Sequence, residues 1–279
     1  MKQSATLEKC VCGESQQTAS THFHSNLEMI FVRSGRASIQ IGKKEYPLER
    51  GALVFLSPSE EHTVHAPTGG YQRSYAILYP TETDKVIGDA RLASVFRSRP
   101  EGFCHEMDMS AHFESIDSCF SHMAEEYRSP SAYSPEIISA CLKQILIMAF
   151  RAHPDSFRLQ KPEEKSPVHA VQRYIETHYD QEILISQLAS ENFISAYHLS
   201  HIFKKQTGYS PKQYLLHTRL TNAKRLLLET DLSVNDLAYR TGFHDVSNFI
   251  RSFRAEYGTT PHRFRADARR HDSDTAYYL

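Results

Sequence analysis

Two histidines and a glutamate near the start of the chain are the first residues whose types and spacing could do chemistry. His22, His24 and Glu28 lie in the stretch THFHSNLEMIFVRSG. Because side chains alternate between the two faces of a strand, these three would point to one face if the stretch is extended. Imidazole and carboxylate groups are ligands for zinc, manganese, iron and nickel, and they also hydrogen-bond polar organic molecules. The spacing therefore predicts a polar site for either a metal or a small organic ligand.

Short apolar or alternating runs, separated by glycines, predict the β-strands that would position this site. These runs are Met29–Val32, Arg36–Ile41, Glu45–Leu48 and Ala52–Leu56. The histidine stretch resembles the first cupin motif, in which His-x-His is followed by three residues, Glu, six residues and Gly, here Gly35. The segment GALVFLSPSEEH, from Gly51, resembles the second cupin motif, although it lacks the glycine that this motif usually carries.

The resemblance implies a cupin-like β-barrel over residues 10–110, and such a barrel can enclose one small ligand. It also places His62 at the remaining ligand position, beside His22, His24 and Glu28. With a divalent metal, these four residues would form the centre of a metal-dependent cupin enzyme. Without metal, they would contact a small-molecule effector or hold one another by hydrogen bonds. We favour effector contact with no cofactor. Further pocket candidates are His65, Arg73 and Tyr75.

Residues 111–153 carry the periodicity of helices. The first run has apolar residues at spacings of three and four, namely Phe113, Ile116, Phe120, Met123 and Tyr127. The second, EIISACLKQILIMAF, is apolar around most of its circumference and needs cover on both faces. One face can pack on the barrel and the other suits a second subunit, with intrachain core as the alternative. We therefore expect a helical dimerisation segment, which charged residues at Phe120 and Ile145 would disrupt.

The C-terminal part is basic, although the whole chain has a net charge of −1. Residues 195–270 hold 13 lysines and arginines but six aspartates and glutamates, a balance that suggests a polyanionic partner. Residues 154–167 contain three prolines and six charged residues without apolar periodicity, which predicts a linker. The five cysteines fit no zinc spacing, and we find no secretory leader and no apolar run long enough to span a bilayer. These features predict a cytoplasmic protein without membrane contact.

A pattern of fifteen residues occurs twice in the basic part. YHLSHIFKKQTGYSP, from Tyr197, aligns with SNFIRSFRAEYGTTP, from Ser247, so that apolar residues, a glycine and a proline coincide. Upstream, Leu188-Ala189 aligns with Leu237-Ala238 at an offset one residue smaller, so the second copy carries one extra residue. A repeat of this size indicates one supersecondary unit that is used twice.

Capping residues identify the unit as a helix-turn-helix, two short helices joined by a tight turn. In the first copy, Ser186 is expected to cap a helix to about Asn192, and Ser195 a second helix that ends at Gly208. Pro211 then starts a long linking helix. The corresponding boundaries in the second copy are Ser233, Asp245, Gly258 and Pro261.

The second helix of each unit leaves an unusual set of residues outside its apolar stripe. In the first copy these are Ala196, Tyr197, Ser200, His201 and Lys204, and in the second Val246, Ser247, Ile250, Arg251 and Arg254. An ordinary exposed face of a helical bundle is the alternative. However, apolar groups beside arginine and histidine suit the major groove of DNA, where thymine methyls and guanine acceptors lie. Lys204, Lys205 and Arg254 lie further along the helices, where they would meet phosphates.

Residues 168–266 resemble the DNA-binding domain of AraC/XylS-family transcription regulators. The match is carried by LASENFISAYHLSHIFKKQTGYSPKQYL and by RLTNAKRLLLETDLSVNDLAYRTGFHDVSNFIRSFRAEYGTTPHRFR. The resemblance implies two helix-turn-helix units on one linking helix, each with a recognition helix in successive major grooves. It assigns base contacts to Tyr197, Ser200, His201, Val246, Ser247, Ile250 and Arg251. It also implies an effector pocket in the barrel, with a carbohydrate as the first candidate, and dimerisation through the helices that follow the barrel.

The sequence thus predicts an α+β multidomain protein: a cupin-like barrel, a helical dimerisation segment, an all-α domain with two helix-turn-helix units, and a flexible tail over 267–279. We expect a homodimeric transcription regulator, such as an activator, that binds double-stranded promoter DNA and a small-molecule effector and could contact RNA polymerase. We do not expect an enzyme. The competing hypotheses are a metal-binding cupin sensor, a metal-dependent cupin enzyme tethered to DNA, and a constitutive DNA-binding protein without effector.

Overall fold

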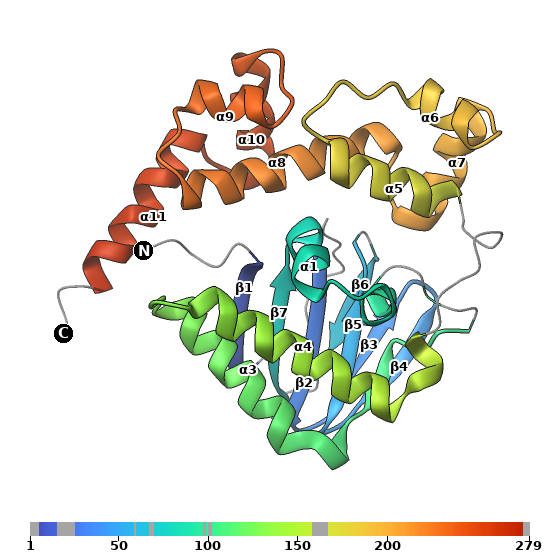
Figure 1. Ribbon diagram of the computed structural model, residues 1–279, viewed down its shortest axis with the longest axis vertical. Coiled ribbons are helices and arrows are strands. Elements are labelled where there is room, and N and C mark those ends of the chain that lie inside the picture. The colour runs from blue at the N-terminus through green and yellow to red at the C-terminus, as the bar shows by residue number, and fades with distance from the viewer. Residues whose placement is uncertain are drawn as a thin grey trace.

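The protein has a strand-rich N-terminal part and a helical C-terminal part, as the sequence predicted (Figure 1). The computed structural model describes residues 6–15, 26–58, 60–66, 70–96, 99, 102–157 and 167–275. Helices within these ranges are too short or too polar to cross a bilayer.

Two antiparallel sheets form the N-terminal part. The five-stranded sheet has the order β1-β7-β2-β5-β8, with bounds β1 Leu7–Ser15, β7 Gln72–Leu78, β2 Leu27–Ser34, β5 Ala52–Leu56 and β8 Glu106–Asp108. The three-stranded sheet has the order β4-β3-β6, with bounds β4 Lys44–Leu48, β3 Ala37–Ile41 and β6 His62–His65. The runs predicted as strands correspond to β2, β3, β4 and β5, within two residues at each end. The other four strands were not predicted, because they are short or interrupted by charged and polar residues.

The five-stranded sheet is buried on both faces. On one face, Ile30 and Val32 of β2 join a core between the two sheets that includes Val54, Val64 and Tyr75. On the other face, Met29 and Phe31 join a second core beneath the helices. Because both faces are covered, β2 is apolar at successive positions rather than at every second one.

Helices α3, Phe113–Arg128, and α4, Ser134–Ala152, cover that second face (Figure 1). The ring of Phe31 stacks on that of Phe120, with 5.8 Å between centroids. Phe120 and Ile145 are both fully buried in this core. The prediction that these two residues lie at a subunit interface was therefore wrong: they hold the helices to their own barrel. The remaining helices of this part are α1 Pro80–Ile87, α2 Ala90–Ala93 and the 3-10 helices Ser94–Phe96, Ser110–His112 and Pro154–Phe157.

The expected linker begins later than predicted. Pro154–Phe157 forms a 3-10 helix whose Phe157 is fully buried in the core beneath α3 and α4. Its ring meets that of Phe150 edge to face, at 5.7 Å between centroids. This segment therefore packs as part of the N-terminal unit, and residues 158–166 lie outside the described residues.

All the regular elements that the structure describes in the C-terminal part are helices. Their bounds are α5 Pro167–His178, α6 Ile185–Glu191, α7 Ala196–Thr207, α8 Pro211–Glu229, α9 Val234–Arg240, α10 Val246–Tyr257 and α11 Pro261–Thr275. Helix α8 contributes to two separate cores: Tyr214 and Leu215 pack with α5, α6 and α7, whereas Leu220, Ala223 and Leu227 pack with α9 and α10. Helix α11 extends over most of the stretch where a flexible tail was expected.

Most of the predicted caps are present. The side chains of Ser195 and Asp245 accept hydrogen bonds from the first turns of α7 and α10, and Ser210 with Gln213 forms a complete capping box at α8. Gly208 ends α7 in the left-handed conformation, with φ 78°. Ser186, however, does not cap α6, because that helix begins at Ile185 and the residue before it, Leu184, makes no side-chain cap bond.

The two parts dock through the linking helix. Lys224 Nζ of α8 lies 2.6 Å from Glu8 Oε1 of β1, and Asn26 Nδ2 donates to the other oxygen of the same carboxylate. The guanidinium of Arg225 lies over the ring of Tyr79, 5.8 Å from its centroid. Figure 1 shows α5 and α8 lying across the end of the strand-rich part that carries α1. The C-terminal helices are therefore joined to the strand-rich part by specific contacts of Lys224 and Arg225.

Candidate nucleic-acid interface and barrel site

Helix α7 presents most of the predicted residues to solvent. Leu199 and Phe203 are fully buried and orient the helix on its core. The outside of the helix then carries Tyr197, His201 and Lys204, and 85% of Tyr197 is exposed. Their spacings of four and three place them on one helical face. Ala196 and Lys205 are also exposed, and Ser200 is half-buried.

Helix α10 repeats this arrangement with different chemistry. Phe249 and Phe253 are fully buried, and Ser247, Arg251 and Arg254 are exposed at the same spacings of four and three. Val246 and Ile250 were predicted to lie outside, but they are half-buried and pack against the core around α8, α9 and α10. The two recognition helices thus present matching sets, Tyr197, His201 and Lys204 on one and Ser247, Arg251 and Arg254 on the other.

The turn of the first unit contains a residue that the sequence analysis missed. Phe193 has a φ of 59° and is 96% exposed. Its counterpart is Gly242, with φ 81°, where a Cβ would lie 2.6 Å from Tyr179 O. A left-handed conformation costs a residue with a side chain about 1–2 kcal/mol, and here no buried contact of the ring offsets that cost. When the two copies are aligned at the smaller offset, Phe193 lies opposite Gly242. A phenylalanine at a position where the other copy has glycine is the sequence signal for this residue.

Within the barrel, the structure brings two of the four predicted site residues together. The carboxylate of Glu28, on β2, lies 3.4 Å from Nε2 of His62, on β6, and both side chains are almost fully buried. His62 Nδ1 lies 2.8 Å from the carbonyl oxygen of Glu60 and donates to it. Because Nδ1 carries a proton, Nε2 of a neutral imidazole holds only a lone pair. A hydrogen bond between Nε2 and Glu28 therefore requires one further proton, either on Nε2 or on the carboxylate. His22 and His24 lie outside the described residues.

The Glu28–His62 pair fits both interpretations of the barrel site. Adjacent ligands of a tetrahedral metal, each about 2.1 Å from it, lie about 3.4 Å apart, and a backbone carbonyl commonly orients a metal-binding imidazole in this way. The same separation also suits an ion pair. Among the described residues, no group of three or more histidines, cysteines, aspartates and glutamates is arranged to hold a metal ion.

Two of the three further pocket candidates lie on the inner face of their sheet, and the third lies on an outer face. Arg73 and Tyr75 are buried on the inner side of β7, and the Arg73 guanidinium lies 4.5 Å from the centroid of the Tyr75 ring. His65 is exposed, because it has the opposite parity to the inward Val64. The suggestion that His65 lines the pocket was therefore wrong.

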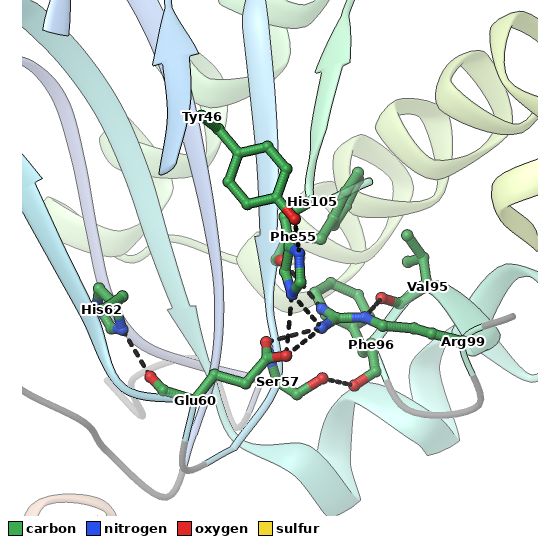
Figure 2. Close-up of polar contacts among 9 residues, drawn as sticks. All are labelled: Tyr46, Phe55, Ser57, Glu60, His62, Val95, Phe96, Arg99 and His105. Atoms are coloured by element: carbon green, nitrogen blue, oxygen red, sulfur yellow. Dashed lines mark hydrogen bonds and ion pairs between the residues drawn. The ribbon is translucent and has the colours of Figure 1, made fainter. Parts of the chain in front are cut away.

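A charged network lies at the end of the barrel, next to His62 (Figure 2). Arg99 Nη1 donates to both carboxylate oxygens of Glu60, at 2.6 and 2.7 Å. His105 Nε2 lies 3.0 Å from Glu60 Oε1, and its Nδ1 lies 3.1 Å from the hydroxyl of Tyr46. Burial alone would raise the pKa of the Glu60 carboxyl, but Arg99 and His105 lower it to about 2. Glu60 is therefore held as a carboxylate by two fixed donors.

Together, the two matched recognition helices and the barrel define the class of protein: a DNA-binding transcription regulator with a cupin domain. Residues 188–267 match the helix-turn-helix domain model and residues 11–72 the cupin domain model. The chain is 31% identical to the HTH-type transcriptional activator RhaS of Escherichia coli over 253 residues, 88% of this chain and 86% of RhaS. It is 33% identical to the probable transcriptional regulator LumQ of Photobacterium leiognathi over 228 residues, 81% of this chain and 86% of LumQ.

The chain belongs to the AraC family of transcription regulators. It also matches the transcriptional activator Btr of Bacillus subtilis at 26% identity, although it spans only 41% of the length of that protein. Its fold is similar to that of apo ToxT from Vibrio cholerae, with a TM-score of 0.55 at 10% identity, over 95% of this chain and 98% of ToxT.

Proposed function

We propose that this protein binds double-stranded promoter DNA as a homodimer and that a small-molecule effector, such as a carbohydrate, controls this binding through the N-terminal part. The observation that carries the proposal is the pair of recognition helices, each with three exposed side chains at the same spacing on a rigid core. The contacts of Glu8 with Lys224 and of Tyr79 with Arg225 support communication between the two parts. We also propose that the protein acts as an activator and contacts RNA polymerase.

Replacing Arg251 with alanine is expected to cost about 1–3 kcal/mol of DNA-binding free energy at one or two base positions. Arg251 is exposed in the middle of α10, where a guanidinium can reach the edge of a guanine. The measurement is a selection from randomised duplexes with the purified full chain. Lys204→Ala is the matched control, since a lysine near the end of α7 is expected to meet phosphate and its loss should weaken all sequences equally. If Arg251→Ala selects the same bases as the unmodified chain, α10 is not a reading helix.

The dimer is proposed to form along the outer face of α4. Exposed residues recur there at spacings of four and three, namely Tyr133, Ile137, Ala140, Gln144, Ile147 and Arg151. Three of them are large and apolar, with 75% of Tyr133, 38% of Ile137 and 37% of Ile147 exposed. An apolar stripe with this period suits packing against an equivalent helix, so a second copy of the chain is the proposed partner.

The barrel residues His22, His24, Glu28 and His62 are proposed to contact the effector rather than to hold a divalent metal. Elemental analysis of protein purified without a histidine tag tests this preference, and we expect metal far below one equivalent. Near-stoichiometric metal that is lost in Glu28→Gln and His62→Ala variants would contradict it. Such a result would favour the competing hypothesis of a metal-dependent cupin enzyme, although the relatives named above are transcription regulators.

A further inference from the structure

Two cysteines meet inside the helical hairpin that covers the barrel. Cys119 lies on α3 and Cys141 on α4, which run side by side (Figure 1), and both residues belong to the core beneath these helices. The two side chains form a hydrogen bond with each other, and neither sulfur is in a disulfide. The packing of the hairpin therefore brings together two reduced thiols from different helices.

The register of the hairpin supports this pair. Next to the loop between the helices, Ser134 Oγ donates to the carboxylate of Glu126. Antiparallel helices rise by the same amount per residue in opposite directions, and about seven residues make two turns. Two turns before Glu126 on α3 and two turns after Ser134 on α4 therefore lie at one level and on the same faces. These positions are Cys119 and Cys141, so a contact at the loop places the thiols opposite each other independently of the bond between them.

The surroundings of Cys141 favour its thiolate, which is the form that attacks oxidants. The hydrogen bond with Cys119 is the largest influence and lowers the pKa of the Cys141 thiol, and a hydrogen bond with His122 lowers this pKa further. Burial and the carboxylate of Glu126 act in the opposite direction without cancelling the effect. The bond between the thiols also raises the pKa of Cys119, which therefore keeps the proton. His122 is exposed and Cys141 keeps 7% of its surface exposed, so the pair lies within reach of a small oxidant.

Strand β1 contributes two further thiols beside the hairpin. Burial, together with Cys12 and Cys141, raises the pKa of the Cys10 thiol to about 12. The sulfur of Cys12 lies 3.3 Å from Ser121 Oγ and 3.4 Å from Ser74 Oγ. Because Cys119 is the thiol that hydrogen-bonds Cys141, it is the one placed to react with Cys141 once that sulfur is oxidised.

We propose that Cys119 and Cys141 are an oxidation site, at which hydrogen peroxide converts the two thiols into a disulfide between α3 and α4. In the first step the sulfur of Cys141 attacks one peroxide oxygen. The S–O bond forms, the O–O bond breaks, and the hydroxide that leaves takes up the proton released by the thiol. In the second step the sulfur of Cys119 attacks that of Cys141. The S–S bond forms, the S–O bond breaks, and the hydroxyl leaves as water with the proton of Cys119.

These two steps balance, because one peroxide is reduced to two waters while two thiols are oxidised to one disulfide. The residues assigned above to DNA contact and to effector contact take no part in them. The oxidation site is therefore a property beyond the function proposed above, and it does not depend on that function.

The test treats the reduced full chain with hydrogen peroxide near neutral pH, alkylates the remaining thiols under denaturing conditions and identifies the peptides by mass spectrometry. We expect one disulfide that links the peptides of Cys119 and Cys141, and a dithiol reductant should restore both thiols. In Cys119→Ser the oxidised Cys141 has lost its partner, so a sulfenic acid should accumulate there and react with dimedone. Cys104→Ser is the control, because Cys104 is an exposed free thiol and its loss should leave the disulfide unchanged.

His122→Ala tests the second hydrogen bond to Cys141. The rate of the first step is expected to fall about tenfold near neutral pH, which corresponds to a rise of about one unit in the pKa of the Cys141 thiol. The midpoint of the rate in a pH series should move upward accordingly, a change that a general loosening of the hairpin would not produce. The titratable groups that face Cys141 are Cys10 of β1 and Cys119, His122 and Glu126 of α3.

Two results would overturn the proposal. The first is that Cys119 and Cys141 remain free thiols after a peroxide treatment that fully oxidises the exposed Cys104. The second is a disulfide that joins Cys141 to Cys10, or to a second chain, in place of Cys119. Both results are read on the unmodified chain, so they remain decisive even if Cys119→Ser or His122→Ala fails to fold.

Discussion

Replacing Ile145 with aspartate is expected to unfold the N-terminal part of the protein. Ile145 is fully buried between α3, α4 and the five-stranded sheet. The substitution removes an apolar side chain from a packed core and places a carboxylate where its surroundings are apolar, so the expected cost is about 5 kcal/mol. A loss of this size is comparable to the whole stability of many domains. Circular dichroism during urea unfolding should show that the strand-rich part is lost without denaturant or at its lowest concentrations.

Ile147→Asp is the matched control, two residues further along α4. Ile147 is 37% exposed, so its replacement should lower the free energy of unfolding by about 1–2 kcal/mol, well below the cost at Ile145. If the proposed dimer forms along this face, however, the same variant should sediment as a folded monomer. A chain that is already monomeric at micromolar concentration before substitution would contradict the dimer without affecting the prediction for Ile145. Equal stability of the two variants would instead contradict the packing described for α4.

Acid is expected to destabilise the N-terminal part through Glu60. The pKa of this carboxyl is about 2 in the folded protein and has an ordinary value of 4.5. Because the folded value is the lower one, the carboxylate contributes stability above the ordinary value, and that contribution is lost as the pH falls from about 5 through 2. A shift of this size corresponds to about 3 kcal/mol. The measurement is the free energy of unfolding in urea as a function of pH.

Glu60→Gln separates this residue from the other carboxylates. Near neutral pH the variant should lose about 3 kcal/mol, because Arg99, whose side chain is 10% exposed, loses its ion pair with Glu60. Below pH 5 its stability should depend less steeply on pH than that of the unmodified chain. Glu49→Gln is the control, since Glu49 pairs with Arg36 at a surface where both side chains are mostly exposed, and such pairs contribute about 0–1 kcal/mol. Identical pH profiles for Glu60→Gln and the unmodified chain would show that the Glu60–Arg99 pair does not govern acid stability.

Much of the DNA-binding domain could be predicted because the signals that specify it are local. Ser195 and Asp245 cap their helices through backbone groups two or three residues away, and Gly208 ends α7 through its own backbone conformation. The buried stripes of α7 and α10 follow from helical periodicity, which leaves Tyr197 and Arg251 on the outside. These relationships span less than four turns of helix, so the order of residues along the chain is enough to establish them.

Long-range packing decided the remaining features, and no local pattern could have supplied them. Whether Ile145 faces its own barrel or a second subunit depends on α3 and the sheet, because an apolar helix shows the same periodicity in both cases. Val246 and Ile250 resemble surface positions on their helix, yet neighbouring helices cover part of each. The bonds of Glu60 with Arg99 and His105 join segments that are far apart in the sequence. Such contacts arise only when the chain has folded, since side-chain chemistry sets which groups can pair but the arrangement of sheets and helices sets which groups meet.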